Sequence, residues 1–154
     1  RVRAGAGTAG AKSPNGQIRN EQMGKGRLQP EFLERIECFS DRCVAVAEQV
    51  VTDGHFPRIA EQLAASGSSV GANLAEADEA MSLKDFRKCL IIASKELAET
   101  RFWLRLVVRR GWLPETRLAS LLVELMEIKR VIGAILSKTA DVSRGKKVSP
   151  VRQT

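Results

Sequence analysis

The chain has 154 residues, 44% of them hydrophobic, which is the length of one domain and enough apolar content to close a core. No apolar run approaches the ~20 residues that span a bilayer, and the first residues lack the apolar segment of a secretory signal, so we expect neither membrane insertion nor export. The formal net charge of +7 is typical of a nucleic-acid-binding protein only if it lies on the folded part.

The positive charge is concentrated in two end segments. Residues 1–29 hold six Lys or Arg against one acid, and residues 138–154 hold five against one. Residues 30–137 hold 14 against 16. Because both end segments also contain Gly, Ser and Gln, we predict a disordered basic N-terminal tail at 1–29, a folded domain at 30–137 and a disordered basic C-terminal tail at 138–154.

Cysteine and histidine usage argues against metal chemistry. Three cysteines in a chain without an export signal indicate reduced thiols and a cytoplasmic protein. The sequence has one histidine, His55, and neither a CxxC nor an HExxH motif, so we predict no metal site, no cofactor and no small-molecule substrate. His55 itself is interpreted as a polar loop residue.

The first two predicted helices are separated by the segment TDGHFP at 52–57. The first helix runs from Pro30, a residue suited to a first helical turn, to Val51. The second begins near Pro57, and its apolar stripe continues without a break in register through SGSSVGANL at 66–74. The apolar positions of the two helices are Phe32, Ile36, Phe39, Cys43, Val46 and Val50, then Ile59, Leu63, Val70, Leu74 and Ala77.

Two further helices complete the domain. Ser82 and Asp85 form a predicted capping box, in which the Ser82 hydroxyl accepts from the Asp85 N–H, and Gly111 ends that helix after Arg110. Pro114 opens the last helix. The core stripes are Phe86, Leu90, Ala93, Leu97, Thr100, Leu104 and Val107, then Leu118, Leu121, Leu125, Ile128, Ile132 and Ile135. These stripes and the short loops predict an all-α fold, an antiparallel up-down four-helix bundle.

The small residues of the second helix predict close helix packing. Gly67 and Gly71 are four apart and therefore share one side of the helix, where a bulky side chain would hold a neighbouring backbone away. The hydroxyls of Ser66 and Ser69 are placed to bond back to the preceding turn. Asn73 and Glu76 are polar residues three apart on the same helix, and their side chains need hydrogen-bond partners if they are buried.

Three apparent functional motifs lack their required context. GAGTAG at 5–10 matches the dinucleotide-binding pattern, but no strand precedes it. No glutamate is followed three residues later by histidine, so a di-iron centre has no Glu-x-x-His pair. The serines at 66–69 lack a nearby histidine base. We predict no catalytic residues.

A resemblance to a known family rests on SSVGANLAEADEAMSLKDF and KCLIIASKELAETRFWL, with HFP before the second helix and EIKRVIGAIL in the fourth. The matching motif positions are Ser69, Val70, Ala72, Asn73, Leu74, Glu76, Ala77, Ser82, Asp85 and Phe86. Over about 30–137 the chain resembles the four-helix-bundle protein family, also called the ribosomal intervening-sequence protein family.

The resemblance implies a small bacterial bundle that assembles as a ring-like homo-oligomer, typically a pentamer. It also implies similarity to the accessory protein of diversity-generating retroelements, which binds a reverse transcriptase and nucleic acid. Many family members carry arginines around the small-residue motif. This chain has Ala64, Ala65, Ala80 and Met81 there, so no RNA-binding role is carried over to those positions.

The third helix has a basic outer face. About half of its circumference carries Lys84, Arg87, Lys88, Lys95, Arg101, Arg105, Arg109 and Arg110. Apolar residues lie among or beside these cations: Ile91, Ile92, Phe102, Trp103 and Leu106. An outer face exposed to water does not favour such side chains, so we predict that it binds something.

Two kinds of partner fit this face, and the alternative without a partner is a solvated charged face with scattered apolar residues. One is a second subunit or another protein, with the apolar residues as anchors and the arginines pairing carboxylates. The other is RNA or DNA, with the cations on phosphates. We predict a non-catalytic homo-oligomeric binding protein, whose partner is nucleic acid or a nucleic-acid enzyme such as a reverse transcriptase. The alternative is an enzyme with an inter-subunit site built on Asn73, Glu76 and Glu99.

Overall fold

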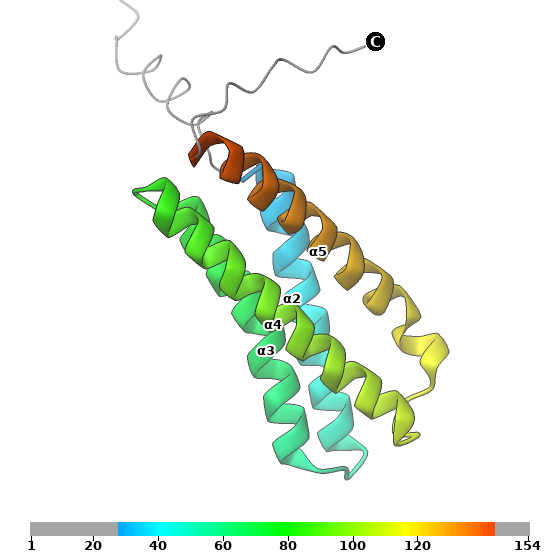
Figure 1. Cartoon of the computed structure of the whole chain (residues 1–154). Helices are drawn as coiled ribbons and strands as arrows, with labels where there is room; N and C mark the ends of the chain where they lie inside the picture. The colour runs from blue at the N-terminus through cyan, green and yellow to red at the C-terminus, as the bar shows by residue number, and fades with distance from the viewer. Residues whose placement is uncertain (1–27, 144–154) are drawn as a thin grey trace, which may run out of the picture.

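The structure, a computed structural model, describes residues 28–143, and in that range it contains four α-helices and no strand. The helices are α2 (Pro30–Thr52), α3 (Pro57–Asp78), α4 (Leu83–Arg109) and α5 (Glu115–Ser143). Consecutive helices run in opposite directions, so the first and last described residues lie at the same end (Figure 1). The predicted all-α four-helix bundle is confirmed.

Local signals in the sequence account for the helix ends. Pro30 and Pro57 stand in the first turns of α2 and α3. The Ser82 hydroxyl accepts from the Asp85 N–H at 3.1 Å, which confirms the predicted cap of α4. Gly111 follows α4 with a φ of +70°, a backbone conformation that residues with a Cβ rarely adopt.

The core is formed by the predicted stripes. Every predicted core position of α4, from Phe86 to Val107, is buried, as are the α5 positions from Leu118 to Ile132. Helix α3 packs extensively on both α2 and α4, whereas α5 lies mainly along α4 and touches α2 less. The bundle is therefore tight around α3 and looser around α5.

Helices α2 and α3 approach closely along the small-residue face. A Cβ on Gly67 would overlap the Cβ of Cys43 and lie 3.0 Å from its Sγ, and a Cβ on Gly71 would lie 2.7 Å from Ser40 Oγ. The Ser40 hydroxyl donates to the Gly67 carbonyl at 3.0 Å. This separation of α2 and α3 therefore requires glycine at position 67.

Two predicted domain boundaries differ from the structure. Leu28, placed in the N-terminal tail, is buried, and its N–H donates to Asp78 Oδ1 at 3.1 Å. Helix α5 continues beyond residue 137 to Ser143; the Arg87 guanidinium donates to the Leu136 carbonyl and the Thr139 hydroxyl, both at 2.6 Å, and so ties this extension to α4. The GAGTAG segment and the rest of both predicted tails lie outside the described residues.

His55 is more than a polar loop residue. Its ring stacks on Trp112 with the centroids 4.8 Å apart and the planes 7° from parallel, and Phe56 contacts the same indole. This stack joins the α2–α3 loop to the α4–α5 loop at one end of the bundle. No helix within 28–143 is long and apolar enough to cross a membrane.

Two glycine-to-alanine substitutions should have opposite effects on stability. We expect Gly67→Ala to lower the free energy of unfolding by about 1–3 kcal/mol, because overpacking against Cys43 outweighs the helix propensity gained. We expect Gly133→Ala, the matched control, to raise it by about 0.5–1 kcal/mol, since that glycine is exposed in α5 and no atom of another helix lies within 4 Å of the new methyl. Urea denaturation of both variants measures the difference; a stabilised Gly67→Ala variant would contradict the close α2–α3 contact.

Candidate functional site

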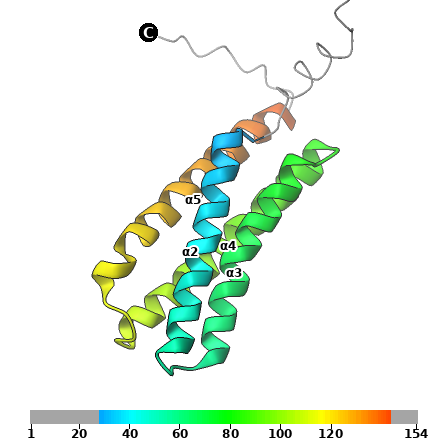
Figure 2. The same ribbon diagram turned by 180° about the vertical axis from the view of Figure 1, so that it is seen from behind.

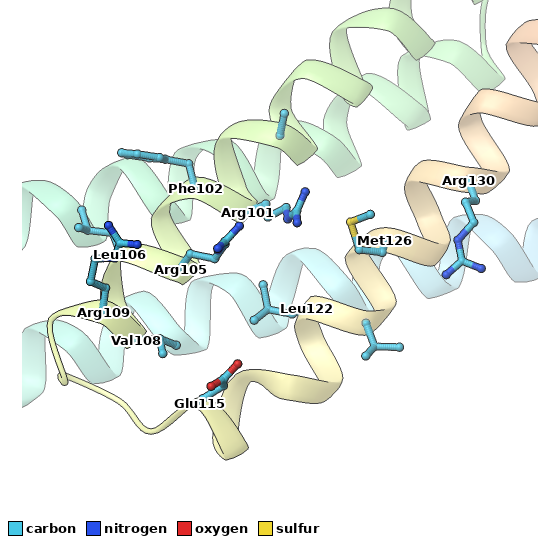
Figure 3. A pocket seen from close by; sticks show the side chains of 12 residues that line it. Arg101, Phe102, Arg105, Leu106, Val108, Arg109, Glu115, Leu122, Met126 and Arg130 are labelled. Carbon is cyan, nitrogen blue, oxygen red and sulfur yellow. The ribbon is translucent and has the colours of Figure 1, made fainter.

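An open groove of about 1110 Å³ runs between α4 and α5. Its apolar lining is contributed by both helices: Ala98, Phe102, Leu106, Val108, Leu122, Val123 and Met126. Phe102 is 58% exposed and Val123 is 59% exposed, which is unusual for large apolar side chains. Figure 3 shows Leu122 and Met126 pointing from α5 toward α4, while Phe102 points away from α5 along the outer surface.

Four arginines surround this apolar lining. Arg101, Arg105 and Arg109 come from α4 and Arg130 from α5, and Glu115 is the single acidic residue among the lining side chains. Arg101 and Arg105 point into the groove in Figure 3. None of the four arginines forms an ion pair with any residue in the described range 28–143. The groove therefore combines exposed apolar area with cations that lack counter-charges.

Two carboxylates of α5, Glu124 and Glu127, are directed at α2 rather than α4. Glu124 Oε1 accepts from Arg35 Nε at 3.2 Å, and the same carboxylate pairs with Arg42. Glu127 also pairs with Arg35, whose pKa is raised by the hydrogen bonds to Glu127 and Glu124. Because these two acids are engaged with α2, they do not form ion pairs with Arg101, Arg105 and Arg109 of α4.

The N-terminal half of α4 carries a second, lysine-rich hollow of about 730 Å³. Its lining residues are Leu83, Lys84, Arg87, Lys88, Ile91, Ile92 and Lys95. The three lysines are exposed and form no ion pair within the described part of the chain. Arg87 differs from them, because its guanidinium is hydrogen-bonded to α5.

The predicted basic face is therefore divided in two. Arg101, Arg105 and Arg109 line the groove, the lysines line the second hollow, and Arg110 follows α4 as its C-cap. Of the predicted apolar residues, Phe102 and Leu106 belong to the groove, and Ile91 and Ile92 belong to the lysine-rich hollow.

Trp103 lies on neither lining. It is half-buried, packs edge-on against Phe102 with centroids 4.8 Å apart, and its Nε1 donates to Glu99 Oε1 at 3.1 Å. Trp103 therefore supports the exposed Phe102 ring from its own helix.

Sequence reasoning missed the α5 half of the groove. Leu122, Met126 and Arg130 are spaced four apart along one side of α5, beside the predicted core stripe. This second row of apolar and basic residues is the signal that points to a surface contact. The sequence alone does not pair it with α4, because the pairing depends on how the helices pack.

The small residues of α3 make hydrogen bonds both within their helix and to α4. Ser66 is buried, donates to the Leu63 carbonyl at 3.2 Å and accepts from Thr100 Oγ1 at 3.0 Å, which links α3 to α4. The back-bond predicted for Ser69 is instead made by Ser68, whose hydroxyl donates to the Ala64 carbonyl at 2.7 Å. Ser69 accepts through its carbonyl from Asn73 Nδ2 at 2.8 Å.

The residues of the alternative enzyme site are not brought together within one chain. The Ser66–Thr100 contact sets the antiparallel register of α3 and α4, so Glu76 lies opposite residues near 90. Glu99 is then about 13 Å away along the helix axis, at 1.5 Å per residue. Glu76 and Glu99 are both exposed. Among the described residues, no group of three or more His, Cys, Asp or Glu is placed to hold a metal ion.

Comparisons with known proteins agree with this architecture. Residues 33–134 match the model of the 23S rRNA-intervening sequence protein family. The chain belongs to this family. A crystal structure of a protein with unknown function from the S23 ribosomal protein family of Bacteroides thetaiotaomicron is 31% identical, with a TM-score of 0.65; the match covers 68% of this chain and 97% of that one. Comparison with curated proteins finds no match.

The family assignment confirms the resemblance to intervening-sequence proteins. The further similarity to the retroelement accessory protein, and the reverse transcriptase partner that it implies, stay predictions.

One carboxylate on α4 gives a pH-dependent prediction. Burial raises the pKa of Glu96, and the Glu99 carboxylate raises it further. The native chain therefore holds this proton more tightly than the unfolded chain, and stability is lost as the pH rises above the ordinary glutamate value of about 4.3. We expect Glu96→Gln to raise the free energy of unfolding at pH 7 by at most about 0.5 kcal/mol, because the carboxylate is partly solvated, and to have no such effect at low pH. Denaturant titrations at both pH values test this, with the exposed Glu79→Gln as control; an equal gain at low pH would contradict it.

Proposed function

We propose that this chain is a non-catalytic homo-oligomeric binding protein, in which the groove between α4 and α5 contacts another subunit and the lysines of α4 bind nucleic acid. The observation that carries the proposal is the groove itself, an apolar lining with four arginines that have no ion-pair partner among the described residues. Such a surface is costly when it faces only water and favourable when it is covered.

The groove has the composition of a protein interface. Exposed aromatic and aliphatic side chains are enriched in interface cores, and arginine is enriched with them. Phe102 has the exposure expected of an anchor residue, and Arg105 and Arg101 stand beside it on the same helix. The family resemblance adds a ring-like assembly, typically a pentamer, as the expected state.

The lysine-rich hollow favours a polyanion instead. Lys84, Lys88 and Lys95 are exposed, and the apolar side chains between them are aliphatic. Lysine acts as a point charge for phosphates, and repetition of the patch around an oligomer would multiply its contacts. The basic segments 1–27 and 144–154 add further positive charge to each copy. We therefore propose RNA or DNA as the partner, held mainly through its backbone.

The alternative enzyme built on Asn73, Glu76 and Glu99 has no geometric support within one subunit. Asn73 is hydrogen-bonded to its own helix, and Glu99 accepts from Trp103. We therefore propose no reaction for this chain.

The lysine patch can be tested by salt-dependent binding to a single-stranded oligonucleotide. We expect the full chain carrying Lys84→Gln, Lys88→Gln and Lys95→Gln to bind more weakly than wild type. The slope of log affinity against log salt should become shallower by about 0.7 for each phosphate that the variant no longer neutralises. Fluorescence anisotropy over a range of salt concentrations measures both quantities.

The matched control removes the same charge elsewhere. Arg58→Gln, Arg117→Gln and Lys138→Gln lie on α3 and α5, and all three side chains are exposed. We expect this variant to bind close to wild type. Equal losses of affinity in the two triple variants would show that binding depends on net charge, and an unaffected α4 variant would assign binding to the end segments.

Assembly through the groove can be tested by mass. We expect Phe102→Glu with Leu106→Glu to reduce the wild-type oligomer toward the 16.9 kDa monomer in light scattering, because two carboxylates would replace the apolar contact. The control, Val51→Glu with Met81→Glu, changes two exposed apolar residues outside the groove and should keep the wild-type mass. A monomeric wild type would refute the homo-oligomer.

A further inference from the structure

Helix α2 presents an acidic stripe to solvent. The stripe consists of five exposed carboxylates, Glu31, Glu34, Glu37, Asp41 and Glu48. At 100° per residue they fall within about 120° of the helix circumference. None of them forms an ion pair within residues 28–143, since the two arginines of α2 are directed at α5.

Two small residues lie within this acidic stripe. Cys38 and Ala45 are seven residues apart, exposed, and lie between the carboxylates. Small residues at this spacing allow another helix or a groove wall to approach along two turns. The stripe is therefore shaped for a close lateral contact as well as charged for a basic partner.

The acidic stripe and the basic groove face opposite ways. Helix α4 is in front in Figure 1, and α2 is in front in Figure 2, where the molecule is seen from behind. The groove residues Arg101 and Arg105 belong to α4, so one copy of the chain carries complementary charges on its two sides. The same chain cannot join these two surfaces within itself.

We propose that the acidic stripe of α2 in one copy occupies the α4–α5 groove of the next copy. This inference rests on the proposed homo-oligomeric function and names the partner surface of the groove. Carboxylates of the stripe supply the counter-charges that the groove arginines lack, and Cys38 and Ala45 allow the stripe to lie against the exposed Phe102.

The end segments of the chain do not fit the same groove. Residues 1–27 carry six basic side chains and one acid, and residues 144–154 carry four basic side chains and no acid. Both would add positive charge to a groove that already holds four arginines.

The proposed contact joins two different faces of the chain, α2 of one copy and the groove of the next. Such a contact is heterologous, and its repetition generates a closed ring or an open filament.

A charge-reversal pair tests the proposed contact in the full chain. We expect Arg101→Glu with Arg105→Glu to raise the dissociation constant of the assembly by about 100-fold, because acidic residues would then meet the acidic stripe. Adding Glu34→Arg and Asp41→Arg to the same chain should restore the wild-type mass in native mass spectrometry, since the charges are exchanged on both surfaces.

The outcomes separate this inference from the function on which it rests. A monomeric wild type would refute both. An oligomeric wild type whose groove variant dissociates without rescue by the α2 substitutions would overturn the α2 contact alone. An unchanged mass of the groove variant, with weakened nucleic-acid binding, would assign the groove to nucleic acid. Arg58→Glu with Arg117→Glu is the matched control, and circular dichroism verifies that each variant is folded.

Cys38 supplies a second, independent test. Cys43 is fully buried and burial raises its pKa to about 12, and Cys89 is also buried, whereas Cys38 is exposed on the stripe. With a bismaleimide cross-linker, Val123→Cys, at an exposed residue of the groove lining, should give a ladder of covalent dimers, trimers and higher species, because each copy then carries both thiols of the contact. Adding Cys38→Ser should remove the ladder. Cross-linked dimers in the wild type would indicate α2 against α2 and overturn the proposal.

Discussion

The arrangement of this bundle depends on the close packing of α3 against both of its neighbours. On one side Gly67 leaves no space for a Cβ beside Cys43, and on the other side Ser66 accepts a hydrogen bond from Thr100. Small residues thus bring α2 and α4 close to α3 from two directions. Because α3 holds these two helices, their remaining surfaces point to opposite sides of the molecule (Figures 1 and 2).

The distribution of charge follows from this packing. Helix α5 pairs Glu124 and Glu127 with the arginines of α2, so it neutralises these cations and leaves the carboxylates of the acidic stripe without ion-pair partners among residues 28–143. The same pairing leaves Arg101, Arg105 and Arg109 of α4 without ion-pair partners in the described chain. A folded domain with nearly balanced charge therefore carries a basic groove and an acidic stripe on separate surfaces, which favours association between copies over a uniformly charged exterior.

Much of the fold could be predicted from the sequence because its signals are local. Ser82 and Asp85 specify the start of α4, and the spacing of apolar residues identifies most of the buried positions, although it misses Ala47, Ala60, Cys89 and Leu113. The predictions are wrong where a distant residue decides the outcome. Leu28 is held by Asp78 and the end of α5 is held by Arg87, and neither contact is visible from neighbouring residues. The sequence predicts only a loop residue at His55, because its partner, Trp112, is 57 positions away.

The sequence by itself determined the four helices, their buried stripes, the basic row on α4 and the family to which the chain belongs. These properties depend on periodicity and capping, which act over one or two helical turns. Only the tertiary structure decided that Met126 and Arg130 of α5 join Arg101 and Arg105 in one groove, and that Glu124 and Glu127 of α5 turn toward α2. The physical reason is that helix pairing is set by side-chain contacts between segments far apart in the chain, and periodicity within one helix carries no information about its neighbour.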